Sequence, residues 1–101
     1  MTIHCESHND GKNITIAISG CFDFNCVQEF RGVYMALDGK KSSVELDMRQ
    51  TEYMDSSALG MLLNMKKHLN AADTDIRIVN CQPQVKKILQ ISRFDKKFTL
   101  S

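Results

Sequence analysis

Three isoleucines alternate with smaller or more polar residues over positions 14–19, near the start of the chain. This period of two predicts a strand with one buried face, and Gly20 is expected to end the strand. An earlier run over residues 3–7 predicts a second strand, and the Asn-Asp-Gly sequence at positions 9–11 favours a hairpin turn between the two. The pattern therefore predicts a β-hairpin over residues 1–20.

A helical period follows a short loop over residues 21–25, in which Asp23 or Asn25 can cap the helix. Apolar residues then recur at helical spacing until Gly39 and Lys40 end the pattern. A first helix is therefore expected directly after the hairpin. Its apolar face comprises Val27, Phe30, Val33, Tyr34 and Leu37.

Alternation returns at Val44, Leu46 and Met48, which predicts a third strand in the centre of the sheet. Residues 49–53 are expected to form a connection, and a second helix is expected to begin at Ser56. The apolar face of this helix is expected to comprise Leu59, Leu62, Leu63 and Leu69.

The last third of the chain predicts a strand, a helix and a short edge strand. A turn over residues 73–75 precedes the strand, and Pro83 suits the first position of the helix. The apolar residues that predict the strand are Ile76, Ile78 and Val79. Those that predict the helix are Val85, Ile88 and Leu89, and those that predict the edge strand are Phe98 and Leu100.

This order of elements predicts an α/β fold. A mixed sheet of four to five strands is expected to carry about three helices, packed mainly on one side. No repeat, low-complexity run or linker interrupts residues 1–101, and this length suits one hydrophobic core. The sequence therefore predicts a single domain.

The balance of charges narrows the class of partner. Thirteen basic and twelve acidic residues give a formal net charge of +1, which shows no bias toward nucleic acid or acidic membranes. No apolar run approaches the roughly 20 residues that span a bilayer, and the first residues have no signal-peptide pattern. We therefore expect a cytoplasmic protein that binds no nucleic acid and does not insert into a membrane.

The four cysteines, Cys5, Cys21, Cys26 and Cys81, form no Cys-x-x-Cys pair and no zinc-finger spacing. Without an export signal they are expected to be reduced, partly buried small apolar residues. His4 and His8 would lie far apart on a strand, so no metal site is expected. The chain also lacks a glycine-rich phosphate loop, and the sequence indicates no cofactor.

The stretch Met54–Gly60 carries the candidate chemistry. Asp55 suits the N-cap of the second helix, because its carboxylate can accept hydrogen bonds from the unpaired N–H groups of the first turn. Ser56 and Ser57 then fall in that first turn, at the positive end of the helix dipole. A phosphate on Ser56 would be tolerated by the helix and would add nearly two negative charges to the surface.

Two features beside this stretch leave alternatives open. Gly60 lowers helix propensity in the second turn, which indicates close packing against the sheet or against a partner. The methionines at positions 35, 48, 54, 61 and 65 fit core positions. Met54 and Met61 are also candidates for exposed contacts, because methionine adapts to partner surfaces.

The element order, the sequence Gly-Cys-Phe-Asp at positions 20–23 and the sequence Met-Asp-Ser-Ser-Ala-Leu-Gly at positions 54–60 resemble a STAS domain, the fold of anti-sigma factor antagonists. The resemblance spans nearly the whole chain. It implies phosphorylation of Ser56, and it matches Asp23 to the family's loop acid. Ala58 replaces the usual glycine and Gln82 replaces a common serine cap; neither change touches the Ser56 hydroxyl.

The resemblance also implies a partner switch. The unphosphorylated chain would bind an anti-sigma factor that is a serine kinase, or a related regulator, and a serine phosphatase would reset the switch after phosphorylation of Ser56. The chain is expected to be a monomer that forms a heterocomplex with this partner, and it would not itself be an enzyme. The implied partner-binding residues are Asp23, Met54, Asp55, Ser57 and Leu59.

Several alternatives remain at this point. Ser56 could be a plain first-turn serine, Asp55 could serve only as a cap, and Ser57 is the second candidate acceptor. The chain could instead be a STAS subunit of a lipid ABC transporter that binds its ATPase without phosphorylation. A small hydrolase or redox enzyme is a third class, but no histidine base is evident beside Ser56 and no cationic neighbour beside Cys21 or Cys26.

Overall fold

A six-stranded sheet with helices on one side forms the framework of the computed structural model, which describes residues 2–8, 13–36, 43–69, 75–96 and 98–100. The elements in chain order are β1 (Thr2–His8), β2 (Asn13–Phe22), the 3-10 helix η1 (Phe24–Cys26), α1 (Val27–Met35), β3 (Ser43–Asp47), β4 (Thr51–Met54), α2 (Ser56–His68), β5 (Asp75–Val79), α3 (Pro83–Ile91), the 3-10 helix η2 (Phe94–Lys96) and β6 (Thr99–Leu100).

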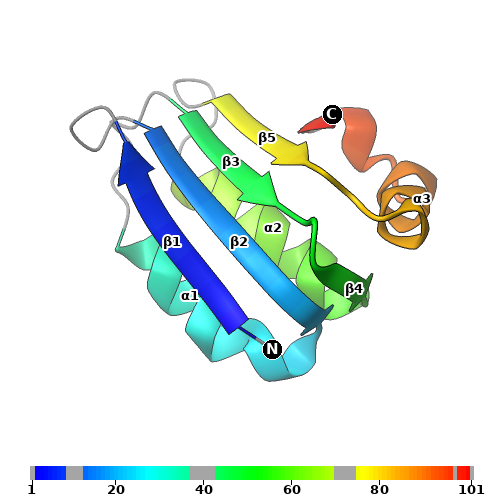
Figure 1. Cartoon of the computed structure of the whole chain (residues 1–101), viewed down its shortest axis with the longest axis horizontal. Helices are drawn as coiled ribbons and strands as arrows, with labels where there is room; N and C mark the ends of the chain where they lie inside the picture. The colour runs from blue at the N-terminus through cyan, green and yellow to red at the C-terminus, as the bar shows by residue number, and fades with distance from the viewer. Residues whose placement is uncertain (1, 9–12, 37–42, 70–74, 97, 101) are drawn as a thin grey trace.

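The strand order is β1-β2-β3-β5-β6, and β1 pairs antiparallel with β2 while β2, β3, β5 and β6 run parallel. The helices α1 and α2 lie behind the sheet as drawn, and α3 lies beyond β5 (Figure 1). Among the described residues, no helix lies over the front face of the sheet in this view. This arrangement confirms the α/β fold with a mixed sheet and helices mainly on one side.

The core lies between the sheet and the pair α1 and α2. Alternate residues of β2 and β3 are buried, as a strand with one covered face requires. The ring centroids of Phe22 and Phe30 are 5.0 Å apart and those of Phe30 and Tyr34 are 5.6 Å apart, so aromatic contacts join α1 to the end of β2. The largest fully buried side chains are Phe22, Phe30, Ile16, Ile18, Leu46, Met48, Met54, Leu62, Met65, Leu69, Ile78 and Leu89.

The long strand β2 has two partners along one edge. Residues 13–17 pair with β3, and residues 20–22 pair with β4, with a register shift between Gly20 and Cys21. The prediction that Gly20 ends the strand is wrong. Gly20 has φ of 86°, a left-handed conformation that glycine adopts without steric cost, and the strand continues through it.

The sequence missed the strand β4 and predicted a plain connection there. Its four residues bury only the first and the last side chains, so no alternation marks them. Thr51 is fully buried, and its hydroxyl donates to the carbonyl oxygen of Ile18 at 2.6 Å. This bond and the pairing with β2 hold β4 in the sheet, which therefore has one strand more than predicted.

The buried face of α2 also differs from the prediction. It comprises Ala58, Met61, Leu62, Met65 and Leu69, whereas Leu63 is 37% exposed and Leu59 is only partly buried. Met61 and Met65 are buried, as predicted for the methionines, and the prediction is wrong only for Leu59 and Leu63.

Met54 and Met61 are 1% and 5% exposed, so the alternative that they are exposed contacts is wrong; Met35, by contrast, is 51% exposed. Nothing lies within 4 Å of a Cβ built on Gly60, so this glycine does not serve packing against the sheet.

The end of α1 and the exposure of two cysteines also differ from the prediction. The helix α1 ends at Met35, with Ala36 as its C-cap, before the predicted end at Gly39. Cys5 and Cys21 are exposed rather than partly buried, whereas Cys26 is buried and Cys81 lies between. The predicted hairpin turn at 9–11, Leu37, Gly39 and Lys40 lie outside the described residues.

Candidate functional site

Two chain segments far apart in sequence meet where β2 and β4 end. The strands run parallel and pair Phe22 with Met54, so Asp23 and Asp55 follow them at the same edge of the sheet. The backbone N–H of Asp55 donates to the carbonyl oxygen of Phe22 at 3.3 Å. The edge therefore brings the Asp23 loop next to the start of α2.

Asp55 is the N-cap of α2, as predicted. Its backbone is extended, and Oδ1 accepts a hydrogen bond from the N–H of Ala58 at 3.1 Å. Ser56 and Ser57 are thus the first two residues of α2. The Ser56 side chain is exposed and that of Ser57 is half-buried. Ser56 therefore presents its hydroxyl to solvent at the positive end of the helix dipole.

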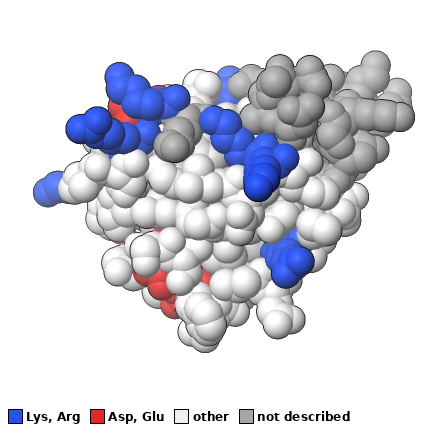
Figure 2. Space-filling view, turned by 180° about the vertical axis from the view of Figure 1, so that it is seen from behind, with Lys and Arg blue, Asp and Glu red and all other residues white. Residues whose placement is uncertain are grey.

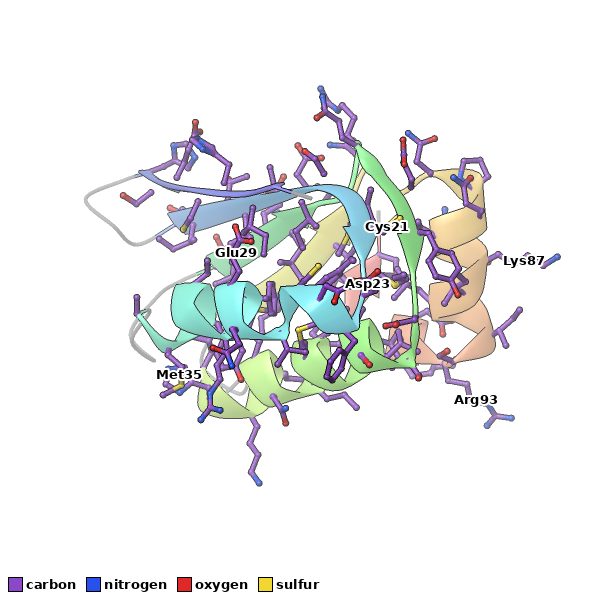
Figure 3. All side chains as sticks on the ribbon, turned by 90° about the horizontal axis from the view of Figure 1, so that it is seen from below. Cys21, Asp23, Glu29, Met35, Lys87 and Arg93 are labelled. Atoms are coloured by element: carbon purple, nitrogen blue, oxygen red, sulfur yellow. The ribbon has the colours of Figure 1, made fainter. Side chains whose placement is uncertain are left out.

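Asp23 caps the adjacent 3-10 helix in the same manner. Its Oδ1 accepts a hydrogen bond from the N–H of Asn25 at 3.0 Å, and the N–H of Asp23 donates to Sγ of Cys26 at 3.4 Å. The predicted capping role of Asp23 is confirmed, although the helix that it caps is η1 rather than α1. Figure 3 shows Asp23 close to Cys21 at the end of β2, beside the start of α1.

The Cys26 thiol belongs to the support of this loop rather than to its surface. Its Sγ donates to the carbonyl oxygen of Cys21 at 3.3 Å and lies 3.8 Å from Oδ1 of Asp23. Burial raises the pKa of Cys26; a backbone hydrogen bond at Asp23 lowers it, and the negative charge of Asp23 raises it further. The thiol therefore stays protonated at neutral pH and is a poor nucleophile.

Two exposed aromatic side chains flank the capped junction. Phe24 directly follows Asp23 and is 71% exposed, and Tyr53 precedes Met54 on β4 and is 52% exposed. Sequence reasoning did not single out either residue. Neighbouring residues of a strand point to opposite faces, so the position of Tyr53 next to the buried Met54 could have indicated its exposure. This signal was not available because the strand itself was not predicted. Exposed aromatic residues are enriched at protein interfaces.

Four of the five predicted partner-binding residues are partly accessible, and Met54 is buried. Asp23, Asp55 and Ser57 are partly accessible around Ser56, and Leu59 is partly buried against the core. Met54 is 1% exposed because its side chain packs beneath the junction, so the prediction of a direct contact through Met54 is wrong.

Within the described ranges, no group of three or more His, Cys, Asp or Glu side chains is placed to hold a metal ion. No helix in that part of the chain is long and apolar enough to cross a membrane. The carboxylates of Asp23 and Asp55 both accept backbone hydrogen bonds. The site therefore consists of two caps, an exposed serine and two aromatic side chains.

A family model described as "STAS domain" matches residues 6–101. A STAS-domain containing protein of Pseudomonas aeruginosa (strain UCBPP-PA14) is 42% identical over 101 residues, which cover all of both chains. The anti-sigma-B factor antagonist of Staphylococcus aureus (strain NCTC 8325 / PS 47) is 24% identical over 94 residues, which cover 91% of this chain and 86% of that protein.

The fold is similar to that of the anti-sigma factor antagonist SpoIIAA. The structure of its unphosphorylated form matches with a TM-score of 0.81 at 20% identity, covering 99% of this chain and 88% of that one. The structure of the Bacillus cell fate determinant SpoIIAA in the phosphorylated form matches with a TM-score of 0.74 at 20% identity, covering 99% and 91%.

Proposed function

Because the chain belongs to the STAS domain family, we propose that it is an anti-sigma factor antagonist whose binding to its partner is controlled by phosphorylation of Ser56. The unphosphorylated chain binds an anti-sigma factor, or a related regulator, and withdraws it from its target. The observation that carries the proposal is the exposed Ser56 hydroxyl at the capped start of α2, beside the Asp23 loop.

The names of relatives support the same role. The Staphylococcus relative is named for antagonism of an anti-sigma factor, and the structural match SpoIIAA carries the same description. SpoIIAA has been solved in a phosphorylated and an unphosphorylated form, and both forms share the fold of this chain.

The partner contacts a face centred on Ser56 in this proposal. Phe24 and Tyr53 offer exposed aromatic area on two sides of it, and the partly accessible Asp23, Asp55, Ser57 and Leu59 complete it. Aromatic side chains that become buried when a complex forms supply much of the binding energy of an interface, whereas charges at its rim contribute less.

Phosphorylation breaks the complex through charge. A phosphoserine carries nearly two negative charges at neutral pH, and it would lie beside the carboxylate of Asp55. A partner surface that covers Ser56 would then have to desolvate a dianion without a matching cation, which is unfavourable. A loss of about 3 kcal/mol already weakens binding more than a hundredfold.

The chemistry of the switch belongs to other proteins. A serine kinase with bound ATP and magnesium transfers the γ-phosphoryl group: the Ser56 oxygen bonds to phosphorus, the bond to the β-phosphate breaks, ADP leaves, and the hydroxyl proton passes to the kinase's base. A serine phosphatase restores the hydroxyl by hydrolysis. The chain has no catalytic role in this cycle. The cycle takes place in the cytoplasm, and the unbound chain is a monomer.

Intact-mass analysis of the chain purified from its native host, with peptide mapping, tests the proposal. We expect a phosphoryl adduct on the peptide that contains Ser56, absent from Ser56→Ala and retained in Ser57→Ala. An adduct on Ser57 alone would move the switch to the second candidate. No adduct under any growth condition would contradict the proposal and favour the lipid-transporter subunit.

A further inference from the structure

A groove runs between α1 and α2 on the helical face, away from the sheet. Its volume is about 390 Å³, and it is lined by Val27, Arg31, Tyr34, Met35, Met61, Asn64, Lys67 and His68. The lining residues of α2 begin at Met61, and Lys67 lies eleven positions after Ser56, about 16 Å along the helix at 1.5 Å per residue. Met61 lies five positions after Ser56, about 7.5 Å along the helix, so the groove begins beyond the face around Ser56 and runs away from it toward Lys67.

The floor of the groove is apolar and well packed. Tyr34 and Met61 are 6% and 5% exposed, and the ring of Tyr34 lies 5.7 Å from that of His68. Met35 stands at the rim and is 51% exposed, which leaves a flexible apolar side chain in solvent at the end of α1. Methionine side chains of this kind adapt to the surface of a bound partner.

The charge on the rim has one sign. Arg31 and Lys67 are both exposed, one on each helix, and neither forms an ion pair or hydrogen bond within the described part of the chain. No acidic residue lines the groove. The helix α2 contains no acidic residue, and Glu29 of α1 lies roughly 200° around the helix axis from Arg31.

The surface view agrees with this distribution. Figure 2 shows basic side chains above and beside a broad uncharged area of the helical face, and the acidic side chains visible in this view border that area below and lie beside basic side chains at the upper left. An apolar floor between two basic rims is complementary to an amphipathic helix with acidic residues on its polar face.

We propose that the groove between α1 and α2 binds an acidic amphipathic helix of a partner protein, at a second site separate from the Ser56 face. The apolar side of that helix packs on the half-buried Val27 and the exposed Met35, above the floor formed by Tyr34 and Met61, and its carboxylates approach Arg31 from one side and Lys67 from the other. The helix α1 has nine residues and is about 13 Å long, so the groove accommodates between two and three helical turns.

A titration of the isotope-labelled full chain with two synthetic peptides tests this site by NMR. Both peptides are amphipathic helices of roughly 15 residues with leucines on one face; the polar face carries glutamates in one and lysines in the other. We expect only the glutamate peptide to bind, with shifts confined to residues 27–35 and 61–68. The double variant Arg31→Glu/Lys67→Glu should weaken this binding at least about tenfold.

The matched control is Lys86→Glu/Lys87→Glu, which changes the net charge equally on the exposed surface of α3. This control and Ser56→Asp should bind the glutamate peptide like the wild type. Lys87 projects from α3, far from Met35 in the view of Figure 3.

Equal binding of both peptides, shifts centred on residues 53–60, or a loss as large in the α3 control would overturn the proposal. Concentration-dependent dimerisation of the free chain that Arg31→Glu abolishes would also overturn it, since the occupant would then be a second copy.

Discussion

Asp23 and Asp55 each use a carboxylate oxygen to cap a helical segment where a strand ends. Capping by aspartate is a local interaction, so the role of Asp55 could be predicted from the order of residues alone. The exposure of Leu63 and Met35 could not, because leucine and methionine differ little in propensity and the packing of the helices on the sheet decides which of them are covered.

Removal of the Asp55 cap should destabilise the fold. We expect Asp55→Ala to lower the free energy of unfolding by about 1 kcal/mol, because the N–H of Ala58 loses its side-chain acceptor. Denaturant unfolding measures this loss. Asp55→Asn keeps an oxygen acceptor without the charge and should retain most of the stability. Equal losses in both variants would contradict a capping role for the side chain.

Gly60 gives a second prediction at the residue scale. A methyl group at this position meets no atom within 4 Å, so Gly60→Ala should raise the free energy of unfolding by about 0.5–1 kcal/mol. Gly60 lies one turn after Ser56 on the same side of α2, so we also expect Gly60→Ala to weaken partner binding.

Gly32 of α1 is the control for Gly60, because a Cβ there also meets open space. Gly32→Ala should stabilise the chain by a similar amount and leave partner binding unchanged. If Gly60→Ala gains stability and binds the partner as the wild type does, the partner does not approach the helix closely at Gly60.

The strand β4 and the helix α3 show how elements position the site. Gln82 donates from Nε2 to the carbonyl oxygen of Arg49 at 2.6 Å, and Gln84 donates to that of Glu52 at 3.2 Å. Gln82 makes no side-chain cap on α3, so its amide ties α3 to the start of β4 instead. The sequence could identify the departure at Gln82, but its partner lies 33 residues away and depends on the fold.

Loss of both amide ties should loosen β4. We expect Gln82→Ala/Gln84→Ala to lower the free energy of unfolding by about 1–2 kcal/mol, since each bond contributes roughly 0.5–1.5 kcal/mol. Gln90→Ala, an exposed glutamine on the same helix, is the control. Faster amide hydrogen exchange over residues 51–54 in the double variant alone would support the ties; unchanged exchange there would contradict them.

At the scale of the molecule, the parallel pairing of β2 with β4 creates the candidate site. The sequence was sufficient for the fold class, the order of the main elements and the start of α2, because periodicity and capping are local. The strand β4 and the exposure of Phe24 and Tyr53 could not be predicted from the sequence. A four-residue strand without alternation, and a side chain directed to solvent by a 3-10 helix, both depend on tertiary contacts.

The most direct test of the switch measures recovery of an anti-sigma factor by the full chain. Wild type, Ser56→Ala and Ser56→Asp are immobilised in equal amounts in extract from the native host, and bound proteins are quantified by mass spectrometry. We expect wild type and Ser56→Ala to recover one anti-sigma factor or related regulator, and Ser56→Asp to bind it at least about a hundredfold more weakly. Equal recovery by Ser56→Asp would contradict the control of binding by charge at Ser56.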